Sequence, residues 1–124
     1  MKIARTSEAE PVPLQAEWFT GEGIRRDVTR IGAPDAGLTV VSFEPSARTN
    51  WHSHSDGQVL FVLDGAGRTA TRREAEVPLA VGDVVYVAPG EEHWHGATES
   101  SSMRHLAVSF GQTDWLEPVD DPTR

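Results

Sequence analysis

Residues 49–65 read TNWHSHSDGQVLFVLDG, and they hold the densest cluster of chemically informative side chains in the chain. His52 and His54 are two positions apart, and side chains at positions i and i+2 of a β-strand point to the same face. The two imidazoles should therefore lie side by side. Residues 55–57 (Ser-Asp-Gly) are typical of a turn, and the apolar residues 59–63 predict a further strand.

A second pair of histidines lies about forty residues further on. Residues 82–95 read GDVVYVAPGEEHWH, so that His93 and His95 repeat the His-x-His spacing. A lone histidine on a strand is usually a surface or structural residue, but four of the five histidines fall in these two units. Imidazole is the commonest protein ligand for Zn, Cu, Fe and Ni. The pattern therefore predicts a metal site.

Both stretches resemble the sequence motifs of the cupin family. The first is similar to G(x)5HxH(x)3-4E(x)6G, with Gln58 at the position of the glutamate and Ser46 at the position of the leading glycine. The second is similar to G(x)5PxG(x)2H(x)3N, with Ala88 in place of the proline and Ala97 in place of the asparagine. The resemblance implies an all-β cupin barrel of the jelly-roll type. It also implies a set of metal ligands, which would be His52, His54, Gln58 and His93.

A narrower resemblance covers most of residues 18–115. The strings FEPSARTNWHSHSDGQ, GDVVYVAPGEEHWHGAT and MRHLAV are similar to single-domain cupins of the carboxymuconolactone-decarboxylase-associated type, which include manganese-dependent hydroxynitrile lyases. This resemblance implies Mn(II) as the favoured divalent metal and places Thr39 and Val41 in a substrate pocket. Fe(II), Ni(II), Co(II), Zn(II) and Cu(II) are also compatible with three imidazoles and one amide oxygen.

The glutamine in this implied ligand set has an electrostatic consequence. With Gln58 in place of glutamate all four ligands are neutral, so a bound divalent ion keeps its full double charge. A more positive ion polarises a bound hydroxyl, carbonyl or nitrile more strongly as a Lewis acid. It is also harder to oxidise to the trivalent state, which favours a non-redox reaction.

Two further histidines are candidates for acid–base catalysis. His95 shares a strand face with His93 and should point into the barrel, where it could act as general acid or base or as a hydrogen-bonding neighbour of the ligands. His105 shares a face with Ala107 and Ser109, whose small side chains leave room for a substrate. His105 is therefore the second candidate, with a structural role as the alternative.

The remaining sequence predicts one all-β domain with an arm and a tail. Many short apolar runs separated by turns, with no amphipathic helical period, argue for strands throughout. We expect an extended N-terminal arm (1–17), the cupin barrel (18–116) and an acidic C-terminal tail (117–124), with strands at 38–43 and 103–110 and a tight connection at 64–67. Trp51 and Trp94 should pack on the face opposite to the histidines.

Composition limits the cellular setting and the partners. The chain has 124 residues, no cysteine and a net charge of −8, so disulfides and thiolate metal sites are excluded and nucleic-acid or anionic-membrane binding is disfavoured. No apolar leader or membrane span is evident, and we expect a cytoplasmic protein. The arm with Trp18 and Phe19 has no obvious role in a lone small barrel, which predicts a homodimer.

Three functions fit these observations. The first is a metal-dependent lyase for a small molecule, acting on a cyanohydrin or a similar carbinol, with His95 as base. The second is a dioxygenase that uses the same ligands. The third is a small-molecule-binding cupin without a reaction. Only the neutral charge of Gln58 ranks the lyase above the dioxygenase.

Overall fold

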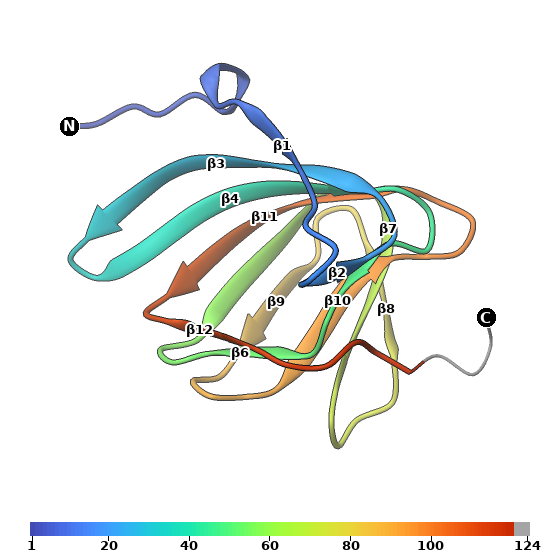
Figure 1. The fold of residues 1–124 in the computed structure, drawn as a ribbon. Helices are drawn as coiled ribbons and strands as arrows, with labels where there is room; N and C mark the ends of the chain where they lie inside the picture. The colour runs from blue at the N-terminus through green and yellow to red at the C-terminus, as the bar shows by residue number, and fades with distance from the viewer. Residues whose placement is uncertain (121–124) are drawn as a thin grey trace.

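The computed structural model describes residues 1–120, and the last four residues of the expected C-terminal tail lie outside this range. The described chain contains a single 3-10 turn, η1 (Thr6–Glu8), and otherwise consists of strands and loops (Figure 1). The strands are β1 (Pro11–Pro13), β2 (Phe19–Thr20), β3 (Gly23–Gly32), β4 (Asp35–Phe43), β5 (Arg48–Thr49), β6 (His52–His54), β7 (Gln58–Thr71), β8 (Val77–Ala80), β9 (Val84–Val87), β10 (His93–Ala97), β11 (Met103–Phe110) and β12 (Thr113–Trp115). No helix within residues 1–120 has the length and apolar character needed to cross a bilayer.

The strands form two antiparallel layers that face each other. One layer contains β1, β3, β4, β11 and β9, and the other contains β10, β5, β2, β8, β6 and β12. Strand β7 pairs with members of both layers and joins them. Figure 1 shows β3, β4 and β11 stacked over β6, β10 and β12 with the barrel interior between them. The expected all-β barrel is thereby confirmed.

Strand β7 differs from the sequence-based expectation. Residues 64–67 were expected to form a tight connection between two strands, but β7 runs without a break from Gln58 to Thr71. Gly65 has φ of 76°, and a Cβ atom there would lie 1.9 Å from the carbonyl oxygen of Ser102. The glycine therefore permits a bend and a close approach to the neighbouring strand inside a continuous strand, rather than a reversal of the chain. The prediction of a turn was wrong because glycine serves both purposes.

The N-terminal arm is fixed to the barrel of its own chain. Strand β1 pairs with β3, and Arg26 donates a hydrogen bond to the carbonyl oxygen of Ala9 over 2.6 Å. Phe19 is buried in the core, and the indole of Trp18 stacks on that of Trp115 with 5.3 Å between ring centroids. The two aromatic residues that directly follow the arm thus have a structural role within one chain.

The apolar core is small, because part of the barrel interior is polar. One cluster includes Phe43, Val62, Met103 and other buried residues between the layers. A second cluster lies on the outer face, where Trp94 packs with Ala70 and Val119, and Trp51 lies against them. The tryptophans next to the histidines thus pack on the opposite face, as expected.

A candidate metal centre in a buried cavity

A cavity of about 270 Å³ opens between the two layers, and most of the sequence-predicted site residues line it. The predicted site residues fall into three groups: metal ligands, acid–base candidates and substrate-pocket residues. All members of the last two groups line the cavity. The predicted residues that line it are His52, His54, Gln58, His95, His105, Thr39, Val41, Ala107 and Ser109. His93 is not among the lining residues, but it is buried and in contact with Gln58, which lines the cavity.

Strand pairing brings the two His-x-His units together. Strand β6 pairs antiparallel with β10, and His52 is the direct partner of His93. In β6 the two histidines are buried and the intervening Ser53 is half-buried, as the alternation of a strand requires. The ring centroids of His52 and His93 are 4.2 Å apart. Two units separated by some forty residues therefore present their imidazoles to one point.

Backbone carbonyl groups set the orientation of two imidazoles. Nδ1 of His52 donates to the carbonyl oxygen of Asn50 over 2.9 Å, and Nδ1 of His93 donates to that of Glu91 over 3.0 Å. A carbonyl oxygen can only accept, so the proton of each neutral ring is on Nδ1. Both Nε2 lone pairs are consequently available for a metal ion, in the manner of ligands oriented by their outer hydrogen bonds.

The contact between His93 and Gln58 indicates most directly whether a metal ion fits this site. Nε2 of His93 lies 2.9 Å from Oε1 of Gln58, while Nε2 of Gln58 donates to Oγ of Ser109 over 2.9 Å. Two acceptor atoms therefore face each other without a proton between them. A cation bound to both removes this repulsion, and two adjacent ligand atoms at about 2.1 Å from one ion lie roughly 3 Å apart. The donor set thus fits a metal ion.

Two more imidazole nitrogens are buried near this contact without hydrogen bonds. Nε2 of His54 and Nε2 of His95 have no partner among the described residues, although Nδ1 of His54 contacts Oγ1 of Thr113 over 3.0 Å. A buried nitrogen without a partner is destabilising, and a bound ion or ligand would satisfy it. The ligand atoms of His52, His93 and His95 lie within 4.8 Å of one another. From the sequence, His95 was expected to be a general acid or base or a hydrogen-bonding neighbour of the ligands, whereas its position also allows it to bind a metal.

His95 and His105 form a buried pair. Nε2 of His105 lies 2.9 Å from Nδ1 of His95, so one ring donates a proton to the other. The edge of each ring meets the ring of Phe43. When His95 is the donor, its Nε2 carries a lone pair directed away from His105. The pair can therefore hold a proton, or pass one, between two imidazoles.

Burial keeps all five imidazoles neutral at pH 7. Desolvation lowers the pKa of His54 and of His105 from 6.5 to about 4, and it also lowers the pKa values of the other three histidines. The proximity of other imidazoles is the next cause for His52, His54 and His95. A metal ligand must be deprotonated. Burial therefore prepares the cluster for an ion at neutral pH.

Several residues that sequence reasoning missed contribute to the cavity. The indole of Trp115 stacks on His52 with 4.6 Å between ring centroids, and no sequence motif around it indicated this position. Arg25, Asp27 and Arg30 of β3 line the mouth. The weak apolar pattern of this strand was a usable signal, because a strand that faces a solvated mouth carries charges where a core strand carries apolar residues.

Residues 39–109 match the sequence model of the Cupin domain family. The chain belongs to the cupin family. It is 41% identical over 128 residues to the (R)-mandelonitrile lyase of Granulicella tundricola, covering 98% of this cupin and 96% of the lyase. It is 31% identical to the acireductone dioxygenase of Gluconacetobacter diazotrophicus over 78% of this cupin but only 54% of the dioxygenase. The crystal structure of a cupin-like protein from Thermotoga maritima resembles this cupin with a TM-score of 0.83 and 34% identity, covering 88% of this chain and 86% of that one.

Proposed function

We propose that this cupin is a metal-dependent lyase that breaks or forms the carbon–carbon bond of a cyanohydrin. The observation that carries the proposal is the buried donor set around Gln58, in which every ligand is neutral. The likeness to a mandelonitrile lyase over nearly the whole chain supports the same reaction class.

The residues that would hold the ion are His52, His54, Gln58 and His93, and Mn(II) is the favoured metal. The ion supplies Lewis-acid polarisation of a bound hydroxyl, carbonyl or nitrile group. The hydrogen bonds of the ligands to Asn50 and Ser109 keep the donor atoms directed at a single point, which limits the reorganisation needed on binding.

His95 would move the proton of the reaction. Its Nε2 atom is buried, carries no hydrogen bond within the described chain and lies in the cavity wall. In the cleavage direction it takes the hydroxyl proton of the cyanohydrin, and the carbon–carbon bond breaks with its electron pair on cyanide. The proton then passes to cyanide, so that the products are a carbonyl compound and hydrogen cyanide. His105, bonded to Nδ1 of His95, would hold that ring in the required orientation and tautomer.

The pocket would select a small substrate. Thr39, Val41, Ala107 and Ser109 occupy little space on one side, and Trp115 lies on the other. A volume of about 270 Å³ is at the lower end of that expected for small-molecule sites, so it admits a compound of the size of a single aromatic ring with a short substituent.

A direct assay tests the proposal. Protein reconstituted with Mn(II) should release hydrogen cyanide from mandelonitrile without consuming oxygen, and metal-free protein should not. A dioxygenase is the second candidate, favoured by the likeness to acireductone dioxygenase. Oxygen uptake with a carbonyl substrate and no cyanide release would support that candidate, and the absence of both activities would leave a binding role.

We also propose that the cupin forms a homodimer. Trp18 and Phe19 pack against their own barrel and do not support a dimer. The support for a dimer comes from the outer face of β7 and β9. Phe61, Val84 and Tyr86 lie on this face with exposed fractions of 39%, 64% and 67%, and Phe61 is the direct strand partner of Val84. An exposed apolar patch on a sheet is a feature of interfaces between proteins.

A further inference from the structure

The mouth of the cavity is more cationic than the rest of the protein. The chain carries a net charge of −8. The described residues that line the cavity nevertheless include two guanidinium groups, on Arg25 and Arg30, and one carboxylate, on Asp27. A bound divalent ion would add to this positive charge. A cleft that is positive inside an acidic protein attracts anions selectively.

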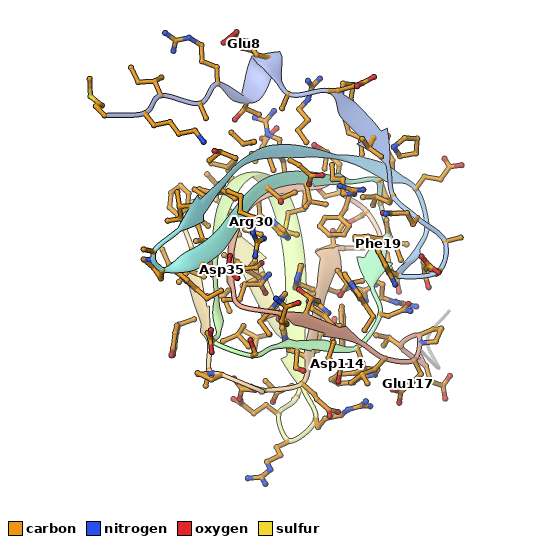
Figure 2. The ribbon with its side chains drawn as sticks, turned by 60° about the vertical axis from the view of Figure 1, so that its left-hand side comes forward. Glu8, Phe19, Arg30, Asp35, Asp114 and Glu117 are labelled. Carbon is orange, nitrogen blue, oxygen red and sulfur yellow. The ribbon has the colours of Figure 1, made fainter. Side chains whose placement is uncertain are left out.

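The two arginines differ in how many of their guanidinium donors are used by other groups of the chain. Arg25 donates from Nε to Gln15 over 3.2 Å and forms an ion pair with Asp27 through Nη1. Arg30 bonds to Asp35 through Nη2 over 2.6 Å, and Asp35 does not line the cavity. Figure 2 shows Arg30 and Asp35 next to each other where β3 and β4 meet. The Arg30 pair is solvent-exposed, so it contributes little to stability and its guanidinium has donors to spare.

Strand register places Arg30 in the same cross-strand row as the metal ligand Gln58. Arg30 pairs with Gly37, Gly37 with Ser109, and Ser109 with Gln58, so that the four residues form one row across four strands. All four line the cavity. Neighbouring strands are about 4.8 Å apart, which puts the Cα atoms of Gly37 and Gln58 roughly 10 Å apart.

Glycine at position 37 leaves space for the guanidinium within this row. A Cβ atom on Gly37 would lie 3.1 Å from Nη1 of Arg30, so the guanidinium lies over the glycine where a side chain would otherwise be. Nη1 makes no hydrogen bond to the described part of the chain. Between it and Gln58 the row contains only the small side chain of Ser109. The cavity therefore has the metal ligands at one end and an available cationic donor at the other.

We propose that Arg30 binds the carboxylate of an anionic substrate while the reacting group of that substrate lies at the metal ligands. The substrate class is then a small hydroxynitrile, or the corresponding aldehyde or ketone, that carries a carboxylate on the far side of the molecule. The nature of the reacting group rests on the proposed lyase function, whereas recognition of the carboxylate does not. Planar guanidinium groups bind carboxylates through paired hydrogen bonds, which also orients the ligand.

Paired probes test this proposal by binding alone. Isothermal titration calorimetry of the Mn(II)-loaded protein would compare 4-formylbenzoate with benzaldehyde, which differ by the carboxylate. We expect 4-formylbenzoate to bind about tenfold more tightly, as a hydrogen bond to a charged group allows, with the difference shrinking at high ionic strength. Equal affinity of the wild-type protein for the two probes would overturn the proposal.

Three variants separate Arg30 from general charge effects. Arg30→Gln should reduce the preference to within about twofold, since the charge-assisted bond is lost. Arg104→Gln removes the same charge from an exposed position on β11 outside the cavity and should keep the preference. Asp35→Asn removes the carboxylate that competes for Arg30 and should increase the preference. A preference that survives in Arg30→Gln, or that falls equally in Arg104→Gln, contradicts the assignment.

Cyanide release separates this inference from the proposed function. Mandelonitrile and the cyanohydrin of 4-formylbenzoate would be compared as substrates of the wild-type protein. A binding preference without cyanide release from either compound would refute the lyase and retain the carboxylate site. Cyanide release with equal kcat/KM and equal affinity for both would retain the lyase and refute the site.

Discussion

Nε2 of His93 and Oε1 of Gln58 face each other as two hydrogen-bond acceptors only 2.9 Å apart. Nδ1 of His93 is engaged with a backbone carbonyl and Nε2 of Gln58 with Ser109, so in this arrangement no proton lies between the two facing atoms. A metal ion between them explains the arrangement.

His93→Ala should abolish most of the metal binding and leave a folded barrel. The substitution removes a ligand, and the apolar core around Phe43 does not depend on an ion. Metal content measured by inductively coupled plasma mass spectrometry, beside circular dichroism, checks both parts. His105→Ala is the control and should retain its metal, because His105 contacts His95 and none of the proposed ligands. Full metal occupancy in His93→Ala would refute the assignment of this ligand.

His54 and His95 can be distinguished by separating metal content from turnover. If His54 is the fourth ligand and His95 the base, His54→Ala loses metal. His95→Ala then keeps its metal and loses about 10²- to 10⁴-fold in kcat, the usual contribution of an acid–base residue. The reverse pattern, with metal lost in His95→Ala and retained in His54→Ala, would make His95 the ligand in the cluster with His52 and His93.

Gln58→Glu should hold metal at least as tightly as the wild-type protein but turn over a cyanohydrin more slowly. The added negative charge strengthens ion binding and weakens polarisation of the substrate. A loss of about 1.4 kcal/mol in transition-state stabilisation corresponds to a tenfold lower rate. Metal affinity and the rate of cyanide release are the measurements. An unchanged rate would remove the charge argument for a lyase, and increased oxygen consumption would favour the dioxygenase.

Stability of the metal-free protein should fall as the pH is lowered from 7.5 to 5.5. The pKa of His54 and of His105 is about 4 in the folded chain and 6.5 in the unfolded chain. Between these values the unfolded chain binds more protons, so acid favours unfolding and the loss begins near pH 6.5. A complete shift from 6.5 to about 4 corresponds to roughly 3 kcal/mol per histidine. Urea denaturation at several pH values checks this, and a constant midpoint from pH 7.5 to 5.5 would contradict it.

The same protonation competes with the metal ion. Imidazole binds a metal only when it is neutral, so lowering the pH should release the ion from the wild-type protein. Because burial lowers the pKa of His54 to about 4, dialysis at decreasing pH followed by metal analysis should show progressive loss as the pH approaches that value. Full retention well below this pH would argue against a site made mainly of histidines.

Val84→Glu should convert the proposed homodimer into a monomer. It places a charge at the centre of the exposed apolar face of β7 and β9, where a second copy would have to bury it. Ile31→Glu is the control, since Ile31 is also an exposed apolar residue but lies near the end of β3. Light scattering coupled to size-exclusion chromatography gives the mass of each variant. A wild-type protein that is monomeric at high concentration would refute the dimer.

Local periodicity was sufficient to predict much of the fold and several residues in the cavity wall. The i, i+2 spacing of His52 and His54, and of His105, Ala107 and Ser109, places each group on one face of a strand whatever the rest of the chain does. The bounds of β11 were predicted to the residue. These features depend on the geometry of a single strand, which the amino-acid order determines directly.

Relations between strands could be decided only by the tertiary structure. Gly65 could have been a turn, and it becomes a bend because Ser102, just before β11, passes too close for a side chain. The bond between His95 and His105 depends on how β10 and β11 face each other across the barrel, and the row from Arg30 to Gln58 depends on the register of four strands. A shift of one residue in any pairing would turn those side chains to the other face. Local sequence determines which residues share a strand face, whereas packing and register determine which faces meet.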